Sequence, residues 1–113
     1  MTILDITTHE RPDGGVQVEL KGELDLATAP KLDDELRRIE ADRPALLVID
    51  LSPLSFMDSS GLRGLLAADS RAREDGRRLV LIRGDDRVQR VLKITRLDER
   101  LEIVDDAESL AGA

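Results

Sequence analysis

Two adjacent serines, Ser59 and Ser60, stand between an aspartate and a glycine in the stretch FMDSSGL (56–62). An apolar run, ALLVID (45–50), precedes this stretch, and a leucine-rich run, LRGLLAADSRARE (62–74), follows it. The two hydroxyls therefore lie where a strand is expected to pass into a helix. The backbone N–H groups and the positive end of the helix dipole at such a junction favour an anion. A kinase could add a phosphate there, which brings about −1.5 to −2 charges at neutral pH.

The same residues also have a simpler structural interpretation. Ser59, Ser60 or Asp58 could serve as the N-cap of the helix, because serine and aspartate are preferred at that position. Their residue types alone do not separate a helix cap from a phosphorylation site.

Enzyme chemistry at the serines has little support. A nucleophilic serine needs a general base and an oxyanion site, and His9, the only histidine, is far from Ser59 in the sequence. The Gly-x-Ser-x-Gly pattern is absent, and GLRG lacks the spacing of a phosphate-binding glycine loop. The acidic pairs at 33–34, 85–86 and 105–106 fit helix starts better than metal ligands. We therefore expect no catalytic residue, no cofactor and no metal site.

Length and composition predict one folded domain over residues 1–113. The chain has no cysteine, 41% hydrophobic residues and 36% charged residues, which is typical of a globular domain. No apolar run approaches the ~20 residues that cross a bilayer. The N-terminal MTILDITT lacks the basic and apolar segments of a secretory signal. We expect a cytoplasmic protein that does not contact membranes.

The net charge of −7 argues against nucleic-acid binding, which needs clustered basic residues. A single aromatic residue also makes a base-stacking surface improbable. The charge is uneven, because residues 59–98 hold 10 basic and 6 acidic residues. Either these bases lie on solvated helix faces and strand ends, or they form a charge-complementary protein interface. The basic residues of this stretch are Arg63, Arg71, Arg73, Arg77, Arg78, Arg83, Arg87, Arg90, Lys93 and Arg96.

Periodicity and turn signals predict an α/β fold, a single-domain mixed β-sheet of about five strands flanked by about four helices. It opens with a β-hairpin, in which the turn RPDGG (11–15) joins TILDITT (2–8) to VQVELKG (16–22). Alternation of strands and helices after the hairpin implies parallel crossover units. The further expected elements are a helix capped by Thr28 and ended by 42–44, strands at 45–51, 78–83 and 101–104, helices within 59–76 and 84–95, and a possible terminal helix in 105–113. We expect SPLSFMDSS (52–60) to be a loop.

The stretch FMDSSGL, together with GELDLATA (22–29), resembles the STAS domain, the module of anti-sigma factor antagonists and sulphate-transporter tails. The likeness is strongest to the bacterial antagonists. It covers nearly the whole chain, with RVLKITRLDE (90–99) also in place. The resemblance implies a mixed β-sheet flanked by helices.

The resemblance also implies a function. The serine after the motif's aspartate, here Ser59, is the family's phosphorylation site. The unphosphorylated antagonist would bind an anti-sigma factor that is itself a serine kinase, and so release a sigma factor. Phosphorylation would end this binding and a PP2C-type phosphatase would restore it, with ATP and Mg²⁺ belonging to the kinase. The implied partner-binding residues are Asp25, Thr28, Asp58, Ser60, Gly61, Leu62 and Arg63. Arg63 departs from many relatives, which have a small or apolar residue there, and this bears on partner identity.

Two other functions of STAS proteins remain open at this point. One is an accessory subunit of an ABC lipid transporter, which binds the ATPase subunit and need not be phosphorylated. The other is a building block of a large multi-STAS signalling assembly. The intact Asp-Ser-Ser-Gly sequence favours the antagonist.

Overall fold

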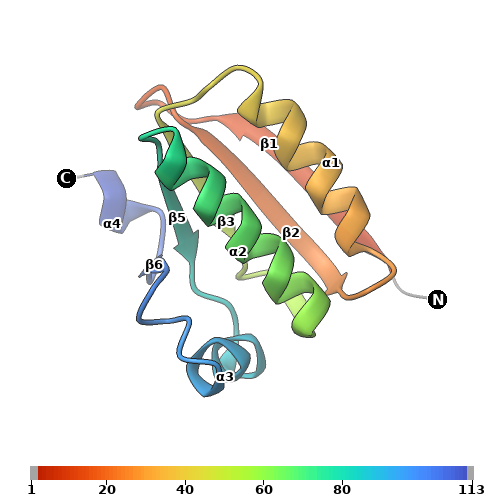
Figure 1. Cartoon of the computed structure of the whole chain (residues 1–113). Coiled ribbons are helices and arrows are strands. Elements are labelled where there is room, and N and C mark those ends of the chain that lie inside the picture. Colours follow the sequence, from red (N-terminus) through yellow and green to blue (C-terminus); the bar gives the residue numbers. More distant parts are fainter. Residues whose placement is uncertain (1–2, 112–113) are drawn as a thin grey trace.

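The computed structural model describes residues 3–111 of the chain, which form a mixed sheet with helices packed on both faces (Figure 1). The neighbour order of the sheet is β1-β2-β3-β5-β6, and β4 also pairs with β2. The elements are β1 (Leu4–Glu10), β2 (Val16–Leu24), α1 (Ala29–Glu40), β3 (Leu46–Asp50), β4 (Leu54–Met57), α2 (Ser59–Glu74), β5 (Arg78–Ile82), α3 (Asp86–Ile94), β6 (Glu102–Val104) and α4 (Glu108–Ala111).

The opening hairpin is confirmed. β1 pairs antiparallel with β2, and the turn between them is closed by hydrogen bonds between Arg11 and residues 14–15. Gly14 has a φ of 89°, a left-handed conformation that glycine adopts without strain. All other strand pairs are parallel, so the predicted mixed sheet with crossover helices is also confirmed.

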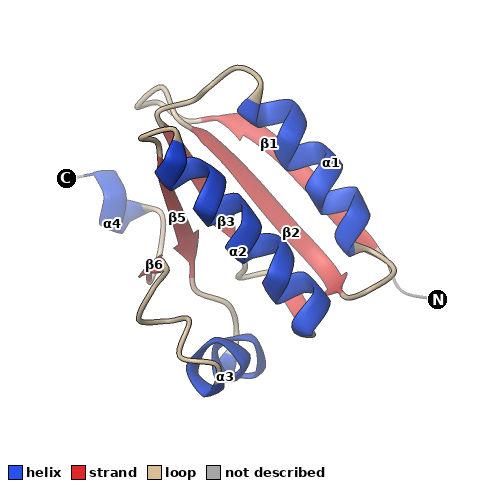
Figure 2. Ribbon diagram, in the orientation of Figure 1, coloured by secondary structure: helices blue, strands red, loops and turns tan. Residues whose placement is uncertain are grey.

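Alternate strand residues divide between two cores. The larger core contains Leu47 and Leu81, and α1 and α2 cover it from one face of the sheet (Figure 2). The smaller core contains Val48 and Val80, which pack with Leu110 of α4 on the other face. Strands buried on both faces lack polar alternation, which is why β3 and β5 read as continuous apolar runs.

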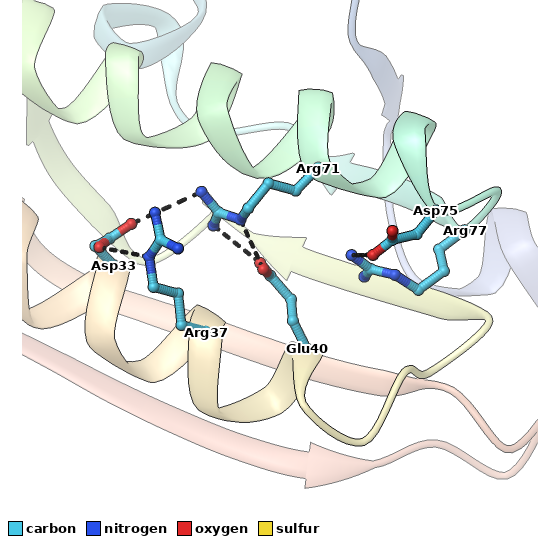
Figure 3. Close-up of polar contacts among 6 residues, drawn as sticks. All are labelled: Asp33, Arg37, Glu40, Arg71, Asp75 and Arg77. Carbon is cyan, nitrogen blue, oxygen red and sulfur yellow. Dashed lines mark hydrogen bonds and ion pairs between the residues drawn. The ribbon is translucent and has the colours of Figure 1, made fainter.

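An ion-pair network joins α1 to α2 (Figure 3). Arg71 of α2 donates to both carboxylate oxygens of Glu40 in α1, at 2.6 and 3.0 Å. Asp33, which is bound to Arg37 at 3.0 Å, lies 3.9 Å from Arg71. The hydrogen bond to Glu40 raises the pKa of Arg71. The network links the C-terminal half of α2 to α1.

The segment 52–60 differs from the expected loop, because it contains the short strand β4. This strand pairs parallel with the end of β2, with Glu23 opposite Phe56 and Leu24 opposite Met57. Its two middle residues are both exposed, so the alternation typical of a half-buried strand is missing. The predicted order of elements therefore lacked one strand, and the sheet has six strands rather than about five.

Candidate partner-binding site at the start of α2

Asp58 and Ser59 directly follow β4, so they lie at the carboxyl ends of the parallel strands. Leu54 and Met57 are buried and hold β4 against the core. The N–H of Asp58 donates to the carbonyl of Leu24 at 3.2 Å, which extends the β2–β4 pairing by one residue. α2 begins at the next residue, Ser59.

Asp58 is the N-cap of α2. Its Oδ1 accepts hydrogen bonds from the N–H groups of Ser60 at 2.9 Å and Gly61 at 3.2 Å, and its carbonyl accepts from Leu62 at 3.1 Å. The capping role therefore belongs to the aspartate and not to either serine. Ser59 is exposed in the first turn, where its hydroxyl is not needed for capping.

This cap changes what a phosphate on Ser59 would meet. The sequence predicts that the phosphate would find unpaired backbone N–H groups at the helix start. Asp58 already occupies the N–H groups of Ser60 and Gly61, so this expectation was wrong for those two donors. A phosphoryl group on Ser59 would instead lie beside a carboxylate, which adds repulsion rather than a new set of hydrogen bonds.

Gly61 allows α2 to start in close contact with β2. A Cβ at this position would lie 2.5 Å from Cγ and 2.9 Å from the backbone oxygen of Leu24. Contacts below 3.0 Å require a shift, and a backbone atom cannot move aside as a side-chain end can. The glycine of the Asp-Ser-Ser-Gly sequence thus allows the first turn of α2 to pack directly against the end of β2.

The β2–α1 loop forms the second part of the site. Because Leu24 and Met57 are paired in register, Asp25 and Asp58 follow them side by side at the ends of adjacent strands. Oδ1 of Asp25 accepts from the N–H groups of Ala27 at 3.0 Å and Thr28 at 3.1 Å. The site therefore combines two carboxylates, each engaged by backbone N–H groups, with an exposed hydroxyl.

Thr28 precedes α1 at the N-cap position, but its side chain makes no capping hydrogen bond. Its hydroxyl instead donates to the carbonyl of Glu23 at 2.8 Å and accepts from the N–H of Asp25 at 2.9 Å. The predicted N-cap position is therefore confirmed, but the Thr28 side chain closes the loop internally and does not cap the helix.

The predicted partner-binding residues separate into two groups by exposure. Thr28 is 7% exposed and Leu62 is 5% exposed, and Gly61 is also buried. Thr28 and Leu62 are turned inward and Gly61 has no side chain, so the three position the loop and the helix; their contact with a partner stays a prediction. The residues that do reach the surface are Asp25, Asp58 and Ser60, which are half-buried, and Arg63, which is exposed. A terminal nitrogen of Arg63 lies 3.4 Å from the hydroxyl of Ser60.

Four large apolar side chains are exposed among the described residues, and sequence reasoning missed most of them. Leu26 in the β2–α1 loop and Ile94 at the end of α3 are each 74% exposed, and Phe56 on β4 is 46% exposed. Ile3, 58% exposed, lies near Glu23, whose N–H donates to its carbonyl. Leu26 directly follows Asp25, and Phe56 lies two residues before Asp58, so these two belong to the segments that form the site. Two signals in the sequence could have indicated exposed apolar side chains: Leu26 lies in a predicted loop, and Phe56 is the single aromatic residue and lies beside the motif.

Residues 3–111 contain no group of three or more His, Cys, Asp or Glu side chains placed to hold a metal ion. Within the same residues, no helix has both the length and the apolar character needed to cross a membrane.

Comparison with known proteins gives consistent matches. Residues 5–110 match the STAS domain family. The chain is 34% identical over 100 residues to the anti-sigma-B factor antagonist of Listeria monocytogenes, covering 88% of each chain. It is 38% identical over 80 residues to the anti-sigma-F factor antagonist RsfB of Mycobacterium tuberculosis, covering 70% of this chain and 66% of RsfB.

A crystal structure of an anti-sigma factor antagonist from Mycobacterium paratuberculosis is also similar, with a TM-score of 0.82 and 30% identity. That alignment covers 95% of this chain and 90% of the other. The fold, the serine motif and these similarities agree with the resemblance noted in the sequence, and the chain belongs to the STAS domain family.

Proposed function

We propose that this chain is an anti-sigma factor antagonist. In its unmodified form it binds an anti-sigma factor that is a serine kinase, and a sigma factor is released. Phosphorylation of Ser59 ends the binding, and a PP2C-type phosphatase restores it. The chain acts by binding and not as an enzyme. The observation that carries the proposal is the exposed Ser59, which follows the capping Asp58 in a site whose two segments also carry the exposed Leu26 and Phe56.

The geometry supports a switch that acts through charge at the surface. The unmodified hydroxyl is small and neutral, so a partner can cover it together with Leu26 and Phe56 nearby. A phosphoryl group would add negative charge beside Asp58 and Asp25 and occupy the space of the partner. Like charges placed across an interface cost on the order of several kcal/mol. Since 1.4 kcal/mol is about a factor of ten in affinity, one phosphoryl group is sufficient to end binding.

The similar proteins support the class of partner. The relatives from Listeria and Mycobacterium are named anti-sigma factor antagonists, which implies an anti-sigma factor as the partner. The kinase and the phosphatase are further parts of the proposal, and they rest on the position of Ser59 in the motif.

A pull-down from cell extract followed by mass spectrometry tests the partner. The baits are the wild type, Ser59→Asp, and the matched control Ser60→Asp, which places the same charge one residue further along the first turn of α2. We expect the wild type to retain an anti-sigma factor with a kinase-like sequence and Ser59→Asp to lose it. The control should retain more than Ser59→Asp. Equal capture of an ABC-transporter ATPase by all three baits would contradict the proposal.

Phosphopeptide mapping tests the site of modification. The purified chain is incubated with the captured kinase and ATP, alongside Ser59→Ala and Ser60→Ala. We expect phosphate on Ser59 in the wild type and in Ser60→Ala, and none in Ser59→Ala. Phosphate found only on Ser60, or retained in full by Ser59→Ala, would show that Ser59 is not the acceptor.

A further inference from the structure

The basic stretch between residues 59 and 98 divides into two groups in the structure. Five of its arginines are ion-paired within the chain, and Figure 3 shows two of these pairs. The pairs are Arg71 with Glu40, Arg73 with Asp69, Arg77 with Asp75, Arg78 with Glu102 and Arg83 with Asp105. Within residues 3–111, no ion pair within 4.0 Å is formed by the other five, which are Arg63, Arg87, Arg90, Lys93 and Arg96.

Three of these unpaired bases lie on one face of α3. Arg87, Arg90 and Lys93 are spaced by three residues, so they are neighbours on the helix surface, and all three are exposed. Ile94, 74% exposed, follows Arg90 by one turn and lies on the same face. We call these four residues the α3 basic surface. The opposite face of the helix carries the buried Val88 and Leu92, so the orientation of α3 is set by the core and the basic face must point outward.

The helix that carries the α3 basic surface packs against β4, the strand that leads directly into Asp58 and Ser59. The loop before α3 is tightly seated, since a Cβ on Gly84 would lie 2.8 Å from the side chain of Val88 and 3.1 Å from the carbonyl of Leu51. The helix therefore has a fixed place beside the site, and one partner could cover both.

We propose that the α3 basic surface binds an acidic region of the same anti-sigma factor, with an apolar side chain of the partner against Ile94. This inference rests on the proposed function. The chain has a net charge of −7 and would repel an acidic partner over most of its surface. Three unpaired cations outweigh the one exposed acid on this face, Asp86, so the local net charge is positive and the repulsion is reduced at one place. This orients the partner during association and increases the association rate.

A protein fits this surface better than a membrane or a nucleic acid. Both of the latter are extended polyanions, so the acidic remainder of the chain would oppose their approach. A single exposed isoleucine on a nine-residue helix also gives little apolar area for insertion among lipids. An acidic patch on a protein needs only local complementarity.

The test compares Arg90→Glu with the matched control Arg43→Glu. Arg43 is exposed, lies in the α1–β3 loop at the opposite end of the molecule, and likewise makes no ion pair among the described residues (Figure 1). Both changes alter the net charge equally. Circular dichroism melts confirm that the variants fold. The wild type and both variants serve as pull-down baits, and association with the captured, purified anti-sigma factor is then measured over a range of salt concentrations.

We expect Arg90→Glu to slow association roughly tenfold at low salt and to remove most of its salt dependence. Arg43→Glu should behave as the wild type. If Arg90→Glu associates with the anti-sigma factor as the wild type does, while Ser59→Asp still loses it, this inference is overturned and the proposed function stands. Capture of no anti-sigma factor by any bait would overturn both. Binding of the wild type and both variants to phosphatidylglycerol vesicles and to duplex DNA is measured as well. If the wild type binds either one, and Arg90→Glu alone loses that binding and still binds the anti-sigma factor as the wild type does, the inference is overturned in favour of a membrane or a nucleic acid.

Discussion

Replacing Gly61 by alanine should destabilise the protein, although alanine is the better helix former. The added Cβ would lie 2.5 Å from Cγ and 2.9 Å from the carbonyl oxygen of Leu24. The backbone oxygen belongs to β2 and is held by the N–H of Asp58 at 3.2 Å. Relief therefore requires the start of α2 to move away from the sheet, which carries Ser59 away from the β2–α1 loop.

Gly64 in the same helix is a matched control, because a Cβ there would meet no atom within 4 Å. Replacing a helical glycine by alanine contributes about 0.5–1 kcal/mol. Overpacking a tight contact costs about 1–3 kcal/mol. We therefore expect Gly64→Ala to stabilise by up to about 1 kcal/mol and Gly61→Ala to destabilise by about 1–2 kcal/mol. In a domain of this size, each kcal/mol corresponds to roughly 4 °C in melting temperature.

Urea denaturation and thermal melts of the wild type, Gly61→Ala and Gly64→Ala measure this difference. The Gly61→Ala protein should also bind the anti-sigma factor more weakly, because Ser59 no longer sits against the loop. If both variants are stabilised to the same degree, the close approach of α2 to Leu24 does not constrain the site and the reasoning is refuted.

Asp25→Ala should lower the free energy of unfolding by about 1 kcal/mol, because Oδ1 of Asp25 accepts two backbone N–H groups. Asp25→Asn keeps an acceptor, so its stability in chemical denaturation should stay within about 0.5 kcal/mol of the wild type. An equal loss of stability in both variants would show that the charge of Asp25, and not its hydrogen bonds, is responsible. Arg71→Ala should lower the free energy of unfolding by about 1–2 kcal/mol, because it leaves the Glu40 carboxylate unpaired. A melting temperature of Arg71→Ala equal to that of the wild type would argue against a stabilising role of the α1–α2 network. Hydrogen bonding to Arg78 lowers the pKa of Glu102 below its usual 4.5. The pair therefore stabilises the fold above about pH 4.5, and this stabilisation disappears as the pH falls through the lowered pKa. Glu102→Gln should accordingly be less stable than the wild type at neutral pH by at most a few tenths of a kcal/mol, since the pair is exposed, and the difference should vanish in acid. A difference that grows in acid would contradict the pairing.

Much of the architecture could be predicted from the sequence because the signals involved are local. Turn residues at 11–15 specified the hairpin, and continuous apolar runs specified β3 and β5. The acidic start of α3 specified its cap, since Asp85 accepts from the N–H groups of Arg87 and Val88. The motif around Ser59 also predicted the family, because residue types at fixed spacing are visible without coordinates.

Other features depended on contacts between segments far apart in the chain. β4 was missed because its two middle residues are exposed and its partner, β2, is about 30 residues away. The same pairing decides that Asp58 rather than a serine caps α2, and that Asp25 lies beside it.

The basic stretch between residues 59 and 98 also combines a feature visible in the sequence, its charge, with one that depends on distant contacts, its ion pairing. Ten bases between residues 59 and 98 have similar local surroundings in the sequence. Whether each is ion-paired depends on which distant carboxylate the fold places opposite it, such as Glu40 for Arg71 or Glu102 for Arg78. The residue types show which positions can carry a charge, a hydroxyl or an apolar contact. Which bases remain unpaired at one surface depends on the fold, because charges compensate one another through space and not along the chain.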